Sequence, residues 1–360
     1  MSEKTKVILL YGGQSTEHEI SCRSAAFVTK FLDQKAYELH AIGIDRQGRF
    51  LPQPTARYQD ETPNVLDIIE GHTGPSQEMI RCLQPGHGLT DQDKPVVFSL
   101  LHGTNGEDGA MQGLLELCQL PYTGPDVAAS ALTMDKILTK ELAQNAGIPV
   151  VPYVWLRKGE WLEDHEAWLQ RIRGVLSGPW FVKPASLGSS VGIGRASNLE
   201  ELEAAIQQAF DFDEKVLVET ALKIREIEYA ALGDYEPEVS LPGEIKSDGF
   251  YSYDSKYSDE STAKVEIADL SKDAQEEGKD LCRRIYKALN LYGMARIDLF
   301  LTDDGRFYLN EVNTVPGFTS ISQYPLLWKA SGIDYPELLN RLIQLALKRS
   351  SSKSQLKRQV

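Results

Sequence analysis

Short apolar runs that end in glycine or polar loops alternate with helical patterns in the first third of the chain. The run Val7–Tyr11 is apolar throughout and leads directly into Gly12 and Gly13, which is typical of a strand buried on both faces of a parallel sheet. The same patterning predicts a helix over residues 21–32 and strands over Ala41–Ile44 and Val96–Leu100. This alternation predicts a doubly wound α/β domain over residues 1–125. Residues 51–94, rich in Pro, Gln and Gly, are expected to form an irregular insertion on it.

A second series of helices and strands begins near Pro125. The apolar pattern predicts one helix from Ala128 to Ala146, because Gly147 and then Pro149 form a helix stop. Further strands are predicted at Val150–Trp155, Trp180–Val182, Lys215–Glu219, Glu228–Leu232, Val239–Ile245, Ala295–Phe300 and Phe307–Glu311, and further helices at Leu199–Phe210, Lys272–Leu289 and Tyr335–Lys348. The polar, basic segment 349–360 is predicted to be a disordered tail.

Composition and charge narrow the class of protein. The 360 residues are 42% hydrophobic and 25% charged, with a net charge of −14, within the range of globular proteins. The acidic balance argues against a general nucleic-acid or anionic-membrane surface, and no apolar run reaches the ~18–20 residues of a membrane span. The four cysteines lack any CxxC spacing and are expected to be free thiols of a cytoplasmic protein.

A Gly/Ser-rich segment, KPASLGSSVGIG at 183–194, follows a predicted strand. Small residues let backbone N–H groups approach phosphate oxygens closely, and Lys183 would reach an α- or β-phosphate. The alternative for such a segment is a bare turn. Neither a GxxxxGK[ST] loop nor a GxGxxG after the first strand occurs, which excludes a Walker A loop and weakens a dinucleotide-dehydrogenase interpretation.

Three oxygen-bearing side chains, Asp298, Glu311 and Asn313, fall on two predicted strands near the end of the chain. Glu311 and Asn313 are two positions apart and share a face, and adjacent strands lie within ~5 Å, so that Asp298 can join them. Hard oxygen donors of this kind suit Mg²⁺ together with phosphate oxygens and water. The alternative is a set of solvated charges at strand ends, but the apolar residues between them favour buried strands.

Two glycine-rich loops lie at the ends of predicted strands, where α/β sheets bind ligands. HGTNGEDGAMQG at 102–113 leads into a helix, whose N-terminus attracts anions, and GGQSTEHEIS spans 12–21. Taken singly, His102 is better explained by a bond to a loop carbonyl and Glu17 by a charge at a helix N-terminus. Together with the lysine loop and the oxygen cluster, they indicate an ATP-dependent enzyme. The polar segment 247–263 is expected to be a functional or mobile loop.

Taken in this order, the motifs resemble the D-alanine–D-alanine ligase family of the ATP-grasp superfamily. The resemblance runs from about Lys6 to Leu347 and is carried by GGQSTEHEIS, HGTNGEDGAMQG, MDK, VKPASLGSSVG, REIEYAALG, LPGEI, YDSKY, RIDLF and NEVNTVPGFTS. It implies an α/β fold with a three-part ATP-grasp architecture. The implied parts are an N-terminal α/β domain (1–125), a central subdomain (126–220) and a C-terminal subdomain (221–348), with ATP held between the last two.

The resemblance also implies a set of residues around the nucleotide. Lys136 and Lys183 would contact the phosphates, and Asp298, Glu311 and Asn313 would bind two Mg²⁺ (or Mn²⁺) ions. The remaining nucleotide contacts would be Glu219 and Leu222 at the adenine edge, Glu226 at the ribose hydroxyls, and Lys256 on a closing loop beside the phosphates.

A further set of residues is implied for the two D-alanine molecules. Glu17 would hold the ammonium group of the first D-alanine, with His102 nearby, and Ser189 and Tyr257 would form a hydrogen-bonded link with Glu17. The others are Arg296 and the Gly317 N–H, as an oxyanion hole, and Ser322 and Gln323, at the carboxylate of the second D-alanine. Two positions depart from the family pattern: Gln323, where many relatives have an apolar residue, and Ile224, where relatives often have glycine.

The implied activity is ATP-dependent ligation of two D-alanine molecules through an acyl phosphate, which supplies a peptidoglycan precursor. One alternative is a D-Ala–D-lactate or D-Ala–D-Ser ligase on the same scaffold, against which Tyr257 argues within the family. A second is a nucleotide-binding sensor without turnover, and a third is a Rossmann-type oxidoreductase. The intact oxygen cluster and Arg296 speak against a sensor. The family further implies a homodimer as an expectation.

Overall fold

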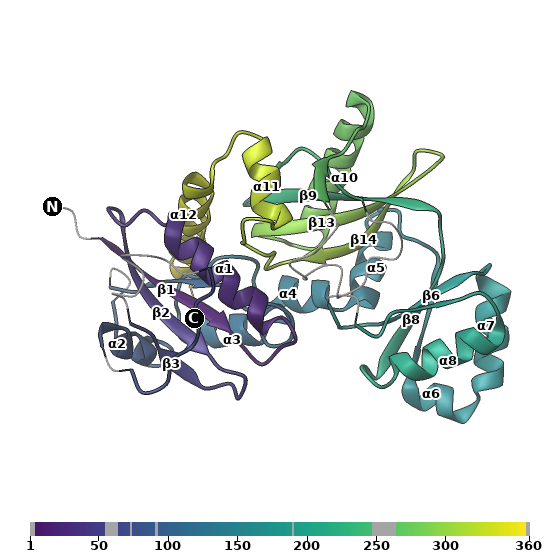
Figure 1. Cartoon of the computed structure of the whole chain (residues 1–360), viewed down its shortest axis with the longest axis horizontal. Helices are drawn as coiled ribbons and strands as arrows, with labels where there is room; N and C mark the ends of the chain where they lie inside the picture. The colour runs from purple at the N-terminus through teal and green to yellow at the C-terminus, as the bar shows by residue number, and fades with distance from the viewer. Residues whose placement is uncertain are drawn as a thin grey trace.

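Three β-sheets, each formed by one stretch of the chain, organise the structure (Figure 1). The computed structural model describes residues 4–54, 64–72, 74–90, 93–188, 191–246 and 264–357. Figure 1 places the sheet of residues 5–99 at one end of the long axis and the sheet of residues 153–220 at the other. The sheet of residues 224–313 lies between them.

The first sheet has the strand order β3-β2-β1-β4, with β2, β1 and β4 parallel and β3 antiparallel to β2. Its strands are β1 (Thr5–Gly12), β2 (Tyr37–Ile44), β3 (Phe50–Pro52) and β4 (Val96–Ser99). Alternate residues of β1 enter two separate cores, with Val7 and Leu9 in one and Ile8 and Leu10 in the other. The uninterrupted apolar sequence of β1 follows from this burial on both faces.

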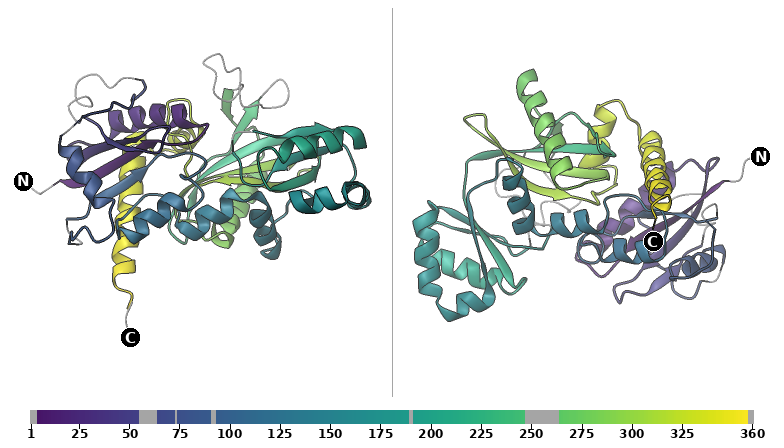
Figure 2. Two further views of the ribbon diagram at one scale, coloured as in Figure 1. Left: turned by 90° about the horizontal axis from the view of Figure 1, so that it is seen from below. Right: turned by 180° about the vertical axis from the view of Figure 1, so that it is seen from behind.

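Helices cover both faces of the first sheet. The core of Val7 is completed by α1 (His18–Phe31) and α12 (Tyr335–Ser354), the C-terminal helix drawn in yellow beside the purple N-terminal domain in Figure 2. The core of Ile8 is completed by α2 (Pro75–Cys82) and α3 (Ala110–Leu117). The predicted doubly wound α/β arrangement is therefore confirmed. The prediction of an irregular segment over 51–94 is wrong for α2, whose Pro75 has the fixed φ that suits a first helical turn.

The second sheet is antiparallel, in the order β5-β8-β6-β7. Its strands are β5 (Tyr153–Arg157), β6 (Trp180–Pro184), β7 (Gly194–Ala196) and β8 (Lys215–Thr220). Three helices form a core with Val182 and Val218 on one face: α6 (Lys158–Glu163), α7 (His165–Val175) and α8 (Leu199–Ala209). Because side chains alternate along a strand, Lys183 and Glu219 project from the opposite face. The helices α6 and α7 were not predicted.

The third sheet is antiparallel, in the order β12-β11-β9-β13-β14, with β10 also paired to β9. Its strands are β9 (Ile224–Gly233), β10 (Glu238–Val239), β11 (Gly243–Lys246), β12 (Lys264–Ile267), β13 (Gly293–Thr302) and β14 (Phe307–Asn313). Along β9, Ile227 and Tyr229 pack with α10 (Lys272–Ala288), whereas Ala230 and Leu232 pack with the unpredicted helix α11 (Gln323–Ala330).

The helix predicted from Ala128 to Ala146 is two helices, α4 (Val127–Met134) and α5 (Lys136–Asn145). Asp135 separates them because it leaves the helical conformation, at φ −87° and ψ 105°. Its carboxylate accepts hydrogen bonds from the backbone N–H groups of Ile137 and Leu138, at 2.9 and 3.1 Å. An aspartate that caps a helix satisfies otherwise unpaired N–H groups, so the break begins α5 at Lys136.

The prediction of a disordered tail from residue 349 is wrong over its first six residues, because α12 continues to Ser354. Arg349 explains this extension. Its guanidinium is buried and donates to the backbone oxygens of Tyr122 and Gly124, both at 2.7 Å. It also lies over the rings of Tyr122 and Tyr292, at 4.2 and 4.9 Å from their centroids. The basic residue that made the segment look solvated is an anchor for the helix.

Replacing Arg349 by alanine is expected to lower the free energy of unfolding by about 3 kcal/mol, since two backbone carbonyls lose a charged donor. The measurement is urea unfolding followed by circular dichroism. Arg306→Ala, in an exposed pair with Asp304 at 3.0 Å, serves as the control and should cost less than ~1 kcal/mol. Equal stabilities for the two variants would show that Arg349 does not anchor α12.

Two other expectations concern thiols and membranes. Cys22, Cys82, Cys118 and Cys282 are all buried and free, as predicted. Across the part of the chain that the structure describes, no helix combines the length and the apolar character that a membrane span demands.

Candidate active site

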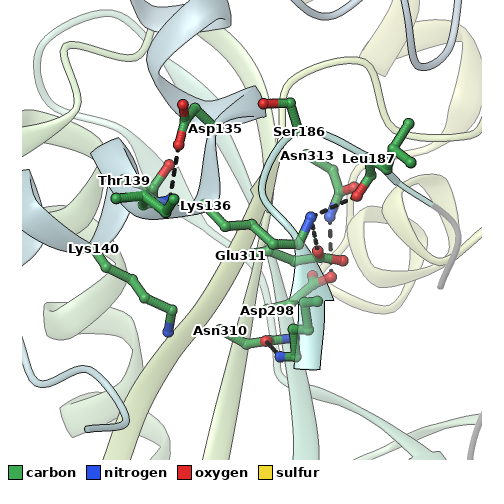
Figure 3. A network of polar contacts seen from close by, with 12 residues as sticks. Asp135, Lys136, Thr139, Lys140, Ser186, Leu187, Asp298, Asn310, Glu311 and Asn313 are labelled. Atoms are coloured by element: carbon green, nitrogen blue, oxygen red, sulfur yellow. Dashed lines mark hydrogen bonds and ion pairs between the residues drawn. The ribbon is translucent and has the colours of Figure 1, made fainter. Parts of the chain in front are cut away.

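A network of charged and amide side chains lies where α5, the second sheet and the third sheet meet (Figure 3). Lys183 of β6 donates to the Oδ1 atom of Asn310 of β14 at 3.3 Å, which joins the two sheets directly. Lys136 at the start of α5 pairs with Glu311 of β14 at 3.5 Å. Residues from three parts of the sequence therefore meet at the junction of α5, β6 and β14.

The centre of this network on the second sheet is a buried carboxylate with two ammonium partners. Lys140 and Lys183 each place Nζ 2.6 Å from one oxygen of Glu219, and Glu219 is 2% exposed. Burial alone would raise the pKa of Glu219, but the two lysines outweigh it and hold that pKa well below its usual range. Burial lowers the pKa of Lys140, and Glu219 opposes that effect. Glu219 is therefore an ionised anchor that positions two cations.

Lys136 links the Gly/Ser-rich loop to the third sheet. Its ammonium donates to the backbone oxygen of Leu187 at 2.6 Å, and its backbone N–H donates to the carbonyl of Ala185 at 2.9 Å. Figure 3 shows its side chain reaching toward Glu311 and Leu187, with Lys140 one turn further along the same helix. Lys136 therefore presents a positive charge beside the loop predicted to hold phosphates.

The oxygen cluster predicted on the last two strands is brought together. Asp298 of β13 lies directly opposite Glu311 of β14, and Arg296 opposite Asn313. The amide of Asn313 donates to Asp298 Oδ2 at 3.0 Å. The guanidinium of Arg296 grips both oxygens of Asp298, at 2.8 and 2.7 Å, and lies 3.3 Å from Glu228. Burial opposes charge on Arg296, but Asp298 and Glu228 outweigh it and hold its pKa well above the usual range.

The donor set in this cluster fits a hard divalent cation. Among the residues that the structure describes, no group of three or more His, Cys, Asp and Glu side chains gathers as a metal site. The cluster offers instead two carboxylates and one amide on neighbouring strands, a set whose oxygens Mg²⁺ accepts when phosphate oxygens complete its coordination. The Oδ1 atom of Asp298 keeps a second lone pair beyond the one that Arg296 uses, whereas Oδ2 accepts from both Arg296 and Asn313.

The two glycine-rich loops at the carboxyl ends of β1 and β4 also meet. A side chain on Gly103 would come within 2.8 Å of Glu17 Oε2, and one on Gly188 within 3.6 Å. Glu17 therefore lies between the 102–113 loop and the loop after β6. His102 is buried and its Nδ1 pairs with the carbonyl of Val315 at 2.7 Å. Burial lowers the pKa of His102, despite the opposing charge of Glu17, so that the ring is neutral.

Glu107 links the 102–113 loop to the segment after β14. Its two carboxylate oxygens accept from the backbone N–H groups of Gly103 and Val315, both at 2.8 Å. Burial, reinforced by the negative charge of Glu17, raises the pKa of Glu107 to about 8. The carboxyl group is therefore protonated in the folded protein over much of the neutral range.

A pH-dependent loss of stability follows from Glu107. A carboxyl whose pKa is raised on folding holds a proton that the unfolded chain has lost, so stability falls as the pH rises toward 8. Wild-type protein is expected to lose up to about 1.4 kcal/mol per pH unit from this group. Glu107→Gln should show a flatter decline between roughly pH 6.5 and 8, measured by urea unfolding. Parallel declines in the two proteins would mean that Glu107 is ionised throughout.

The predicted acceptor-site residues, Ser322 and Gln323, lie where a tight turn leads into α11. The Ser322 hydroxyl accepts from the Thr319 N–H at 2.9 Å and pairs with the Thr319 hydroxyl at 2.7 Å. A side chain on Gly317 would come within 2.7 Å of Ser322 Oγ, so a larger residue there would displace the Ser322 hydroxyl. Gln323 is buried at the first position of α11. The oxyanion hole of Arg296 with the Gly317 N–H stays a prediction.

The other predicted residues divide into two groups. Leu222 lies in the connection between β8 and β9, and Glu226 lies on β9 opposite Phe300 of β13. Ser189, Lys256 and Tyr257 lie outside the described residues, as does the predicted closing loop 247–263.

Three titratable groups of the site were not singled out from the sequence. Lys140 follows Lys136 by one helical turn, Glu107 stands inside the HGTNGEDGAMQG motif, and Glu228 lies in REIEYAALG. The available signal for Glu228 was a charged residue between Ile227 and Tyr229, whereas Lys140 stands between Thr139 and Glu141 and gave no such signal. Their partners, Glu219 and Arg296, are distant in sequence, so the pairing itself could only come from the fold.

Comparison with solved structures identifies the class to which this fold and site belong. A D-alanine–D-alanine ligase from Coxiella burnetii matches with a TM-score of 0.80 and 35% identity, covering 98% of this chain and 97% of the other. The VanG D-Ala:D-Ser ligase from Enterococcus faecalis matches with a TM-score of 0.79 and 33% identity, covering 96% and 100%. The predicted ATP-grasp fold is thereby confirmed.

Family models narrow the class further. The model of the D-ala D-ala ligase N-terminus matches residues 6–125, and that of the D-ala D-ala ligase C-terminus matches residues 142–344. A D-alanine–D-alanine ligase from Sodalis glossinidius is 45% identical over 354 residues, 96% of each chain. The chain belongs to the D-alanine–D-alanine ligase family.

Proposed function

We propose that this chain joins two D-alanine molecules into D-alanyl-D-alanine, with cleavage of ATP to ADP and phosphate, to supply a precursor of the bacterial cell wall. Membership of the ligase family over nearly the whole chain supports the activity. The observation that carries the assignment of the site is the junction of α5 with two sheets. There Lys136 and Lys183 stand beside the oxygen cluster of Asp298, Glu311 and Asn313.

A carboxylate must be activated before an amine can displace its oxygen, because oxide is a poor leaving group. In the proposed reaction, a carboxylate oxygen of the first D-alanine attacks the γ-phosphorus of ATP, and the bond to ADP breaks. The amine of the second D-alanine then attacks the acyl carbon, loses a proton, and expels phosphate. Phosphoryl transfer depends mainly on positioning and charge neutralisation, which Lys136, Lys183 and Arg296 would supply at this site.

The oxygen cluster would hold the divalent cations that accompany ATP. Asp298, Glu311 and Asn313 are the residues we assign to them, with Mg²⁺ or Mn²⁺ as the ion. When bound, such an ion neutralises charge on the phosphate oxygens. In this protein the guanidinium of Arg296 shares Asp298 with that site, and it would remain available to the developing oxyanion of the second step.

The first D-alanine would lie near Glu17, between the 102–113 loop and the loop after β6. Glu17 would accept its ammonium group, with the neutral ring of His102 nearby. Ser189 and Tyr257 would link to Glu17, and Lys256 would approach the phosphates. Ser322 and Gln323 would hold the carboxylate of the second D-alanine. For the nucleotide we assign Glu219 and Leu222 to the adenine edge and Glu226 to the ribose.

Phosphate release from ATP tests the proposal. The assay compares D-alanine, D-alanine with D-lactate, D-alanine with D-serine, and no amino acid, each with Mg²⁺. Release that depends on D-alanine, with D-alanyl-D-alanine as the main product, is the expected result. A main product ending in D-serine, as for the structural neighbour named above, or in D-lactate would overturn the choice of acceptor. No release in any mixture would overturn the enzymatic proposal.

We further propose that the reaction takes place in the cytoplasm, which the four free thiols support. The division into domains at residues 125 and 220, and a homodimer, are proposed on the family resemblance.

A further inference from the structure

We propose that Lys140 is a positioning residue of the nucleotide site: its ammonium keeps the Glu219 carboxylate paired, so that Lys183 can leave Glu219 for a nucleotide phosphate. This inference rests on the proposed function, since it requires that Lys183 binds phosphate. Lys140 itself does not touch the nucleotide in this arrangement. It acts through Glu219.

The geometry that carries the proposal is a carboxylate held on both sides. Glu219 has Lys140 2.6 Å from Oε1 and Lys183 2.6 Å from Oε2. Lys183 also reaches Asn310 at 3.3 Å, next in sequence to the oxygen cluster. Lys140 comes from α5 and is 1% exposed. One lysine therefore faces the phosphate-binding side of the site, and the other is enclosed behind the carboxylate.

The energetics of a buried charge explain why two lysines are present. Removing one partner from a buried ion pair is strongly destabilising, because the remaining charge loses its compensation. If Lys183 were the sole cation beside Glu219, nucleotide binding would have to break that pair and leave a carboxylate at 2% exposure without any opposite charge. With Lys140 in place, Glu219 keeps one cation at contact distance while Lys183 moves.

The groups that face Glu219 come from three elements. They are Lys140 of α5, Lys183 of β6, and Tyr153 of β5, which is paired with Glu219 in the sheet register. Burial raises the pKa of Tyr153, so its phenol stays neutral. In a Lys140→Met variant, nucleotide binding would therefore strand Glu219, which would take up a proton. In the wild-type protein Glu219 would stay ionised.

Calorimetric titration with Mg²⁺–ADP between about pH 7 and 9, above the pKa near 6 of a terminal phosphate, tests this coupling. Lys140→Met should bind ADP at least about tenfold more weakly than wild type at pH 8. Its affinity should also fall further as the pH rises, with net proton uptake approaching one per ADP. The wild-type protein should take up close to none. Turnover at saturating ATP should change less than about threefold, because Lys140 does not touch the reacting atoms.

Two comparisons separate this effect from a general loss of structure. Lys287→Met removes a half-exposed lysine paired with Glu236 at 2.6 Å and should bind ADP as wild type does. In Lys140→Met/Glu219→Gln, no carboxylate is stranded, so the affinity should lie within about threefold of Glu219→Gln alone. Additive effects in this pair would overturn the proposal, as would wild-type affinity and no proton uptake in Lys140→Met.

Should Lys140→Met fail to fold, the wild-type titration still decides. Proton uptake near zero in several buffers supports a Glu219 that stays paired, and uptake near one overturns the proposal. Failure of the wild-type protein to bind ADP at all is a different result, since it overturns the proposed nucleotide site. If the wild-type protein binds ADP and Lys140→Met binds it equally well, only the role of Lys140 is overturned and the nucleotide site stands.

Discussion

Replacing Arg296 by alanine is expected to lower kcat by at least about a hundredfold. Donors aimed at a developing oxyanion are typically worth ~2.7–4 kcal/mol, and Arg296 is the cation that grips Asp298 through both oxygens. The variant would also leave Asp298 and Glu228 without the charge that now lies 2.7 and 3.3 Å away. The measurement is steady-state phosphate release with saturating ATP and D-alanine.

The control for Arg296→Ala removes an arginine that also pairs with a carboxylate but lies outside the site. Arg225 on β9 also grips a carboxylate through both oxygens, those of Glu244 at 2.7 Å each. Arg225→Ala should keep kcat within about threefold of wild type. Arg296→Lys should restore only part of the lost rate, because an ammonium lacks the planar fork that matches a carboxylate. A normal kcat in Arg296→Ala would remove Arg296 from the catalytic role.

Replacing Glu311 by glutamine is expected to weaken divalent-cation binding and to lower kcat by about a hundredfold or more. The loss of about 3 kcal/mol of charge stabilisation corresponds to that factor. Glu311 lies directly opposite Asp298 and 3.5 Å from Lys136, so the amide would leave Lys136 without its carboxylate partner as well. Binding of Mn²⁺ with ADP, followed by electron paramagnetic resonance, gives a measurement that does not depend on turnover.

Glu236→Gln provides the comparison for Glu311, because Glu236 is an exposed carboxylate in a surface pair. It should leave both Mn²⁺ binding and turnover unchanged. If Glu311→Gln bound Mn²⁺–ADP as tightly as wild type, Glu311 would not be a metal ligand. The role assigned to the oxygen cluster would then have to pass to other side chains.

Local pattern was sufficient to predict most of the longer strands and many helices. The short strands β3, β7 and β12 were not predicted, and the single strand predicted over Val239–Ile245 is two strands, β10 and β11. The apolar run at Val7–Tyr11 predicts a strand that is buried on both faces, as β1 is. Asp298, Glu311 and Asn313 meet because side chains alternate along a strand and because neighbouring strands pair in register. The failures have physical reasons too. Asp135 interrupts a pattern that is helical on both sides, and only its capping bonds to Ile137 and Leu138 show that it does so. Arg349 looked solvated because its carbonyl partners lie more than 200 residues away in sequence.

The buried charges show a different limit. Glu219 was singled out from the sequence and Lys140 was not, because the sequence does not say which opposite charge a buried residue will meet. The tertiary packing of α5 on β8 brings Lys140 and Glu219 together as an ion pair at 2.6 Å. The site was therefore predictable where its members share a strand pair, and unpredictable where separate layers supply them.

The last helix of the chain covers one face of the first sheet. Leu338, Leu342 and Ile343 of α12 belong to the same core as Val7 and Leu9. A nascent chain that contains the N-terminal strands and α1 therefore has a sheet face that α1 covers only in part, and the remaining apolar residues of that face stay exposed until α12 has been synthesised. Chaperones that bind nascent chains would have to shield this face for longest. A chain that ended before α12 would be prone to aggregate rather than fold as a smaller protein.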